Sequence, residues 1–303
     1  MNENIKIAAG YVLICILWGS TWLVIRLGLD SLTPVLSAGL RFSLASVLIF
    51  LLMKVNGIKL QTDRTSIKLY IMLGFLSFVI PFGLVYWAEQ FVPSGLASVL
   101  FGIMPFGVIL FSRLMIIQRI GPYQTAGVVL GFAGLVTIFS ENLSFDFSEG
   151  FWGMAAVVAS ATIQAYIAVK IKKSGQHLNP LSMNFIPLII AGITMSLYGL
   201  FFEDMSRVTF NLNAIFSISY LAMFGTVATF TTYYWLMKRI DVVILSISAF
   251  ITPIVAVILG WFVLDENLSM RDLTGSAMVL MGILFANFRG LRNYYLRKKQ
   301  LAE

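Results

Sequence analysis

The chain has 303 residues, of which 59% are apolar and 12% are charged. Soluble proteins carry about 45 to 50% apolar and about 25% charged residues, so this composition excludes an ordinary soluble globular protein. The net charge of +7 is compatible with nucleic-acid binding, but the placement of the charges indicates a membrane topology instead. Cys15 is the only cysteine, which excludes an intramolecular disulfide and a cysteine-ligated metal cluster.

Apolar segments follow one another along almost the whole chain. A helix needs about 20 such residues to span roughly 30 Å of hydrocarbon, because its backbone groups must pair within the segment. The first segment has no small-residue cleavage site after it, so we expect a retained helix rather than a signal peptide. We predict ten transmembrane helices, over residues 6–28, 34–53, 67–88, 94–116, 122–140, 150–170, 180–202, 214–237, 242–264 and 272–289.

Positive charges lie on one side of this predicted topology. With a cytoplasmic N-terminus, 17 of the 21 Lys and Arg residues fall on the cytoplasmic side. This distribution predicts that both termini are cytoplasmic in a multi-pass protein of the inner (plasma) membrane. The basic tail RNYYLRKK, residues 292–299, is then expected to bind anionic lipid headgroups, and no nucleic-acid partner is expected.

The two halves of the chain repeat each other. At a constant offset of 148 residues, identical residues recur, including Tyr86/Tyr234, Trp87/Trp235, Pro105/Pro253, Gly127/Gly275 and Gly134/Gly282. Each half holds five predicted helices, and because five is odd the second half must insert upside down. We therefore predict an all-α membrane protein made of two inverted five-helix repeats, residues 1–143 and 144–303.

Several loose motifs recur in a recognisable order. They are LWGSTWLVIRLGL from Leu17, PVLSAGLRFSLASVLIFLL from Pro34, FGIMPFGVILF before the first repeat's last helix, and GPYQTAGVVLGFAGLVTI within it. Together they resemble the ten-helix EamA branch of the drug/metabolite transporter superfamily. The resemblance implies export or exchange of small metabolites, such as amino acids or amphipathic drug-like compounds. It also implies a central cavity lined mainly by helices 1, 3, 4, 6, 8 and 9. The sixth helix departs from the pattern, because Gln164 and Tyr166 stand where relatives often carry tryptophan.

Polar and aromatic side chains inside the predicted helices are the candidate substrate-binding residues. Each of them has the alternative role of joining neighbouring helices. As a set they form aromatic walls with a few polar groups, which suits an apolar or amphipathic solute, including an amino acid or an organic cation. They are Trp18, Ser20, Thr21, Tyr86, Ser98, Phe101, Gln164, Tyr166, Thr229, Tyr233, Tyr234 and Ser246.

Four further residues have structural, gating or hinge roles. Arg41 lies about seven residues into the second helix, roughly 10 Å deep, where it either serves function or has a structural role, by snorkelling outward or by tying the helix to a carbonyl. Asp30, in the loop before this helix, is a candidate partner for it. Pro105 and Pro253 are predicted to kink mid-helix and shape the pathway, or to pack statically. Glu89 ends the third helix, as a gate or as an ordinary interfacial acid.

The glycine spacing of the fifth helix bears on the oligomeric state. Gly127 and Gly131 form a GxxxG pair, which predicts close helix packing within the chain, with a dimer contact as the alternative. We expect a monomer and leave a dimer open.

A secondary transporter that works by alternating access is the leading functional prediction. A G-x-x-x-x-G-K-[ST] phosphate loop does not occur, which argues against an ATP-driven pump. Nucleotide-sugar or sugar-phosphate carriers need several cavity cations, and Arg41 is the one deep candidate. A membrane enzyme would need a catalytic constellation at membrane depth, and the single histidine, His177, falls in a predicted loop.

We therefore predict no enzyme activity, no cofactor and no metal. A membrane enzyme, a sensor and a structural role remain alternatives, and proton coupling is left open.

Overall fold

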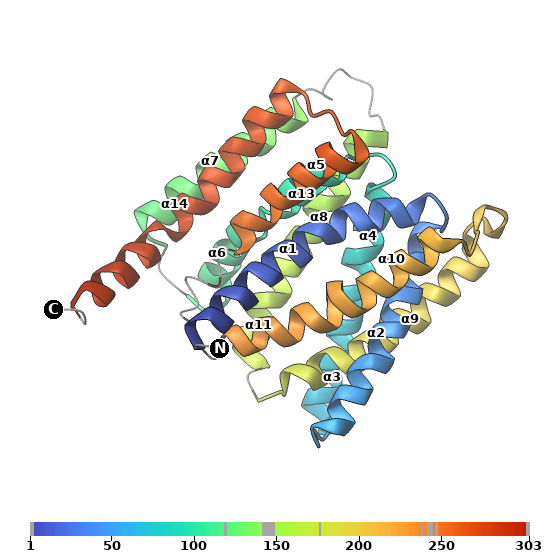
Figure 1. The fold of residues 1–303 in the computed structure, drawn as a ribbon. Coiled ribbons are helices and arrows are strands. Elements are labelled where there is room, and N and C mark those ends of the chain that lie inside the picture. Colours follow the sequence, from blue (N-terminus) through green and yellow to red (C-terminus); the bar gives the residue numbers. More distant parts are fainter. Residues whose placement is uncertain are drawn as a thin grey trace.

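A computed structural model describes residues 3–117, 120–140, 149–175, 177–237, 239–240, 245 and 248–300, excepting the side chains at 234, 237, 289, 291 and 293–300. Over these residues the chain is helical and has no strand (Figure 1). Eight helical spans are long and apolar enough to cross a membrane, and a shorter apolar helix and a long C-terminal helix complete the ten. The prediction of an all-α membrane protein is confirmed.

The first repeat contains five spans, two of which are divided. They are α1 (Glu3–Leu29), α2 (Pro34–Val55), the third span of α3 (Arg64–Leu73), π-helix η1 (Gly74–Val79) and α4 (Ile80–Ala88), the fourth span of α5 (Ser94–Phe101) and α6 (Met104–Met115), and α7 (Pro122–Phe139).

The second repeat follows the same plan. It comprises α8 (Glu149–Ser174), α9 (Pro180–Phe202), the 3₁₀ turn η2 (Met205–Arg207), the eighth span of α10 (Leu212–Ala222), π-helix η3 (Met223–Ala228) and α11 (Thr229–Met237), then α13 (Ser248–Leu264) and α14 (Met270–Gln300). The π-helices η1 and η3 occupy matching places in the two repeats. The predicted domain boundary at residues 143 and 144 lies outside the described residues.

Polar caps explain where two helices begin earlier than predicted. The Asp63 carboxylate accepts a hydrogen bond from the Ser66 backbone N–H at 3.1 Å, so α3 begins at Arg64 rather than at residue 67. Asn211 likewise accepts from the Ala214 N–H at 3.0 Å and starts α10 at Leu212. At the other extreme, α14 continues to Gln300, beyond the predicted residue 289, because Arg, Lys and Leu in the basic tail favour helix.

The second and the fifth helices of the two repeats each lie side by side with their equivalents and run antiparallel to them. A Cβ on Gly127 of α7 would lie 2.5 Å from the Gly282 carbonyl oxygen of α14, and one on Gly134 would lie 2.6 Å from that of Gly275. Residue numbers rise along one helix as they fall along the other, and α2 and α9 show the same pattern, which confirms the inverted repeat (Figure 1). The predicted GxxxG packing of the fifth helix is made to α14 of the same chain.

The alternating direction of the helices defines two ends of the bundle. We call the end where α1 begins the basal end and the end where α1 finishes the distal end. Helices α2, α5, α8, α10 and α14 start at the distal end. The positive-inside prediction places the basal end in the cytoplasm.

The two prolines that share a register in the repeats behave differently. The fourth span was predicted as one helix kinked at Pro105, but it stops at Phe101 and restarts at Met104. Pro105 lies in the first turn of the new helix, where a missing N–H costs nothing. Pro253, its repeat equivalent, lies inside the continuous helix α13. The repeat therefore breaks one helix and leaves its counterpart continuous.

Candidate solute-binding cavity

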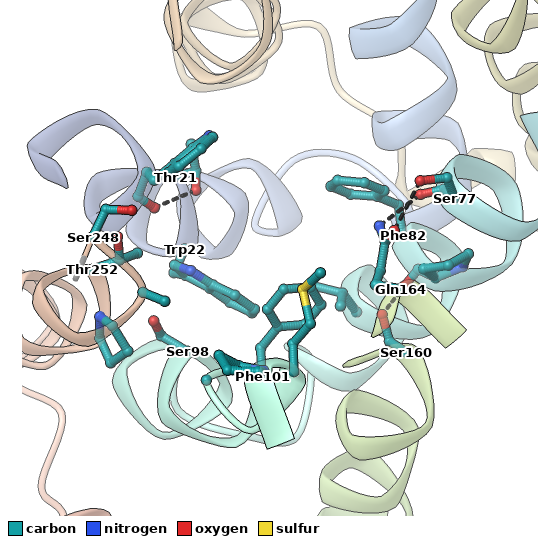
Figure 2. A pocket seen from close by; sticks show the side chains of 18 of the residues that line it. Thr21, Trp22, Ser77, Phe82, Ser98, Phe101, Ser160, Gln164, Ser248 and Thr252 are labelled. Atoms are coloured by element: carbon teal, nitrogen blue, oxygen red, sulfur yellow. Dashed lines mark hydrogen bonds between the residues drawn. The ribbon is translucent and has the colours of Figure 1, made fainter. Parts of the chain in front are cut away.

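A cavity of about 660 Å³ lies between the two repeats. Side chains from α1, α2, the third and fourth spans, α8, the eighth span and α13 line it, with α7 and α14 contributing near the basal end. Figure 2 shows Trp22, Thr252 and Ser98 on one side, with Phe82 and Gln164 opposite. This volume is in the range of cavities that hold small organic ligands.

Aromatic rings form much of the cavity wall. Trp22 and Phe101 lie with ring centroids 5.6 Å apart, and Trp18 and Tyr233 are 5.3 Å apart. Phe82, from α4, lies across the cavity from Trp22 (Figure 2). Such paired rings hold each other in place and present broad apolar faces to a solute.

A fixed polar group lies on the α4 and α8 side. Pro81 has no N–H to donate to the carbonyl groups of the preceding turn, which includes Ser77. The Gln164 amide donates to the Ser77 carbonyl at 2.8 Å, and the Ser77 hydroxyl donates back to the Gln164 oxygen at 2.8 Å (Figure 2). Ser160, one turn from Gln164, donates to the Pro81 carbonyl at 2.9 Å. These bonds join η1 and α4 to α8.

Two hydroxyl groups on the opposite side are unpaired. Ser98 of α5 and Thr252 of α13 both line the cavity, and their hydroxyl oxygens are buried without a hydrogen-bond partner among the described residues. Nearby hydroxyls are already engaged, since Ser248 donates to the Leu245 carbonyl and Thr21 to the Trp18 carbonyl, both at 2.7 Å. Buried polar groups normally have a partner, so this pair is a candidate position for a bound solute or water molecule.

Arg41 lines the distal part of the cavity and is 4% exposed. Its guanidinium donates to the Tyr86 hydroxyl at 3.2 Å, the Thr226 hydroxyl at 3.3 Å and the Gly225 carbonyl at 3.5 Å. It also lies 5.2 Å from the ring centroid of Phe82. Arg41 thus ties α2 to the third and eighth spans, while Asp30, the partner considered from the sequence, is exposed.

The structure brings many of the predicted site residues to the cavity. Those that line it are Trp18, Thr21, Arg41, Ser98, Phe101, Pro105, Gln164, Tyr233 and Pro253. Tyr86 does not line it but binds Arg41, and Thr229 donates to the Thr226 carbonyl at 3.3 Å. Ser20 bonds the Tyr220 hydroxyl at 2.7 Å, and Tyr166 packs edge-on against Phe111.

Two predicted residues cannot be placed, and one is corrected. Ser246 and the side chain of Tyr234 lie outside the described residues. Glu89 was expected near the outer surface, with an ordinary interfacial acid as the simpler interpretation, and that interpretation is wrong. Its side chain is 0% exposed. Glu266, in the loop after α13, interacts electrostatically with Glu89 and accepts backbone N–H groups at the start of α5.

Sequence reasoning missed several lining residues, among them Trp22, Ser77, Phe82, Ser160, Thr226 and Thr252. Helical spacing was the available signal for two of them: Trp22 lies four residues after Trp18, and Ser160 lies four before Gln164. For Ser77 the signal was Pro81, a proline within an apolar span that removes one N–H donor to the preceding turn.

The cavity extends toward the basal end and stops short of the distal end. At the basal end it reaches Gln124 in the first turn of α7. At the distal end the helices touch: a Cβ on Gly95 of α5 would lie 2.9 Å from the Val257 Cα of α13. The Glu266 carboxylate seals the same place by accepting from the backbone N–H groups of Ser94 at 2.7 Å and Gly95 at 3.0 Å.

Comparisons with known proteins agree with this architecture. Residues 6–140 and 151–288 each match the EamA-like transporter family. The chain is 25% identical to an uncharacterized transporter, YoaV, of Bacillus subtilis, over 94% of this chain and 97% of that protein. It is 26% identical to protein PagO of Salmonella typhimurium, over 93% and 92%, and 27% identical to an uncharacterized inner membrane transporter, YedA, of Escherichia coli, over 89% and 86%. A solved crystal structure shares the fold, with a TM-score of 0.68 at 18% identity over 95% of this chain and 98% of the other.

Proposed function

Because the chain belongs to the EamA-like transporter family, we propose that it is a secondary transporter that exports or exchanges small metabolites by alternating access around the central cavity. Amino acids and amphipathic drug-like compounds are the proposed solutes. The family and the names of the relatives indicate a transporter rather than an enzyme.

The observation that carries the proposal is a cavity of about 660 Å³ between inverted repeats, extended toward one end and sealed at the other. This is the form expected of one state of an alternating-access carrier. With the basal end in the cytoplasm, the state is inward-facing. Rocking of the repeats would open the distal end and close the basal one.

The lining favours a singly charged or zwitterionic solute with an apolar body. Arg41 is the one cation among the described lining residues, and its guanidinium already has three neutral partners. A phosphate dianion would need more positive charge than this. The structure therefore offers no observation in favour of a nucleotide-sugar or sugar-phosphate carrier.

Solute counterflow into proteoliposomes tests the proposal. Vesicles with purified protein are loaded with unlabelled amino acids, and the entry of labelled amino acids and amphipathic fluorescent compounds is measured without ATP. Val108 of α6 lines the cavity, whereas Leu110 of the same helix is 39% exposed on the outer surface of the bundle. We expect Val108→Trp to abolish flux by filling the cavity and Leu110→Trp to preserve it. Equal flux in the two variants, or solute-specific chemistry without flux, would contradict the proposal.

A further inference from the structure

Glu89 is a buried acid that does not line the cavity. It follows Ala88, the last residue of the third membrane span, and lies at the distal seal. Its side chain is 0% exposed, and neither carboxyl oxygen has a hydrogen-bond partner among the described residues. Burying a carboxylate without partners costs several times more than burying the neutral acid. The closed distal end therefore requires a neutral Glu89 carboxyl.

The charged groups around Glu89 act in opposite directions. Burial raises the pKa of Glu89 well above its ordinary value, and the Glu266 carboxylate adds to this effect, whereas Arg26 and Arg41 oppose it. Arg26, on α1, donates to the Glu89 backbone carbonyl, and no ion pair with the carboxylate is formed among the described residues.

The remaining titratable neighbours do not neutralise Glu89. Tyr86, on its own helix, is neutral and already accepts a hydrogen bond from Arg41. On α8, which packs against α4, Glu149 is exposed at the start of the helix. The two acids nearest the seal thus differ, since the Glu266 carboxylate accepts two backbone N–H groups, whereas the Glu89 carboxyl has no hydrogen-bond partner among the described residues.

We propose that Glu89 is a proton-binding site of this carrier, which holds a proton while the distal end is closed and releases it when that end opens to water. The inference rests on the proposed alternating-access function. On closing, a carboxylate oxygen of Glu89 takes one proton from the distal compartment, and on opening the proton returns to water. Each return from the distally open state to the distally closed state therefore takes up one proton from the distal compartment.

The sign of the pH dependence follows from linkage. The closed state holds the proton more tightly than the open state, so closure is fully favoured below the pKa of the hydrated, open-state carboxyl. This preference is lost as pH rises toward the higher pKa of the closed state. Between the two values the ratio of open to closed protein rises by up to about tenfold per pH unit.

Thiol labelling of the full chain in lipid nanodiscs tests this. In a Cys15→Ser background, Ser94→Cys places a thiol at a site that is 0% exposed beneath Glu266. A membrane-impermeant maleimide reaches it only when the distal end opens. Thr209→Cys, at an exposed distal position, gives the reference rate that corrects for thiol ionisation. We expect corrected labelling to rise with pH when Glu89 is present and to stay low and flat with Glu89→Gln, which imitates the protonated acid.

Two further carboxylates provide a matched pair. Glu266→Gln removes the neighbouring negative charge, so the labelling curve should reach its plateau at a lower pH. Glu203 is the matched carboxylate, because it accepts the backbone N–H groups of Val35 and Leu36 at the start of α2. Glu203→Gln should leave the plateau pH unaltered. A flat curve in the parent protein, or a pH dependence that survives Glu89→Gln, would overturn the proton site while leaving the carrier function intact. If the thiol of the Ser94→Cys variant never reacts while the Thr209→Cys reference does, that result would instead count against alternating access itself.

Discussion

The two ends of the bundle are held together in different ways. At the distal end, Glu203 and Glu266 of the second repeat each accept two backbone N–H groups from the first turn of a first-repeat helix, at 2.7 to 3.0 Å. At the basal end, long flexible side chains join the repeats: Lys173 donates to the Met115 carbonyl at 3.1 Å, and Arg239 pairs with Glu3 at 3.1 Å.

This difference explains which end is closed. A carboxylate at a helix N-terminus combines charge-assisted hydrogen bonds with the favourable end of the helix dipole, and the backbone fixes the position of the N–H donors. Solvent-exposed pairs between long side chains contribute little. The repeats match in sequence, yet acids collect at the distal end and Lys and Arg at the basal end, so a symmetric fold has one strong seal and one weak one.

Gly95→Val should break the distal seal with the largest effect. A Cβ at this position would lie 2.9 Å from the Val257 Cα, so α5 and α13 must separate. We expect solute flux to fall by more than about tenfold, because overpacking of this kind costs about 1 to 3 kcal/mol in the closed state. Distal labelling of Ser94→Cys should become fast at every pH.

A matched glycine change separates this effect from a general loss of folding. Gly83→Ala in α4 introduces a Cβ whose nearest neighbour is the Met195 methyl at 3.9 Å, so flux and labelling should stay near the parent values. Slow labelling in Gly95→Val would show that the α5 and α13 contact is not the seal.

Glu266→Gln should weaken the same seal by a smaller amount. The amide keeps an acceptor but loses the charge that strengthens two hydrogen bonds to α5, worth about 1.5 kcal/mol, so distal labelling at fixed pH should rise about tenfold. Glu203→Gln should lower thermal stability with little change in labelling. The α2 and α9 helices stay packed along their length, where Gly39 and Gly192 meet Ser196 and Ser43. Equal labelling increases in both variants would show that the Glu203 contact with α2 and the Glu266 contact with α5 contribute equally to closing the distal end.

The fold could be predicted well from the sequence, because the signals for it are either local or come from comparing one half of the chain with the other. Apolar span length, loop charge and the offset that pairs Gly127 with Gly275 can be read without knowing any contact, and an odd helix number then dictates inversion. The contacts of Gly127 with Gly282 and of Gly134 with Gly275 are the exchange that a two-fold axis requires.

The site was harder to predict because its decisive contacts are distant in sequence. Glu89 follows an apolar run, which is typical of an interfacial residue, yet it is buried, and Glu266, which acts on it electrostatically, belongs to the other repeat. The π-helices η1 and η3 have no shared residue pattern, and only η1 is followed by a proline, Pro81. Helical spacing points to one face of a helix, but it does not say which neighbour that face meets.

Two Thr→Val changes compare an unpaired and a paired hydroxyl group in the cavity between the two ends. The Thr252 hydroxyl has no partner among the described residues, so its isosteric removal should raise the free energy of unfolding by up to about 1 kcal/mol and weaken solute binding. Thr226 donates to the Leu221 carbonyl at 2.9 Å and accepts from Arg41, so Thr226→Val should lower it by about 1 to 3 kcal/mol. Thermal unfolding in nanodiscs with and without solute measures both. Destabilisation by Thr252→Val would mean that its hydroxyl is bound in the empty carrier.

Arg239→Gln should have the smallest effect, which would confirm the weakness of the basal end. The Arg239 and Glu3 side chains are 38% and 57% exposed, and Arg239 also lies 4.4 Å from the Trp235 ring centroid. Exposed pairs of this kind contribute about 0 to 1 kcal/mol and are screened by salt, so the unfolding temperature should change little, and less at high ionic strength. Glu3→Gln is the matched change, because it removes the ion pair and keeps the contact with Trp235. A salt-insensitive loss in Arg239→Gln, absent from Glu3→Gln, would assign the contribution to the ring contact. A large loss in both variants would show that the basal end is sealed as firmly as the distal one.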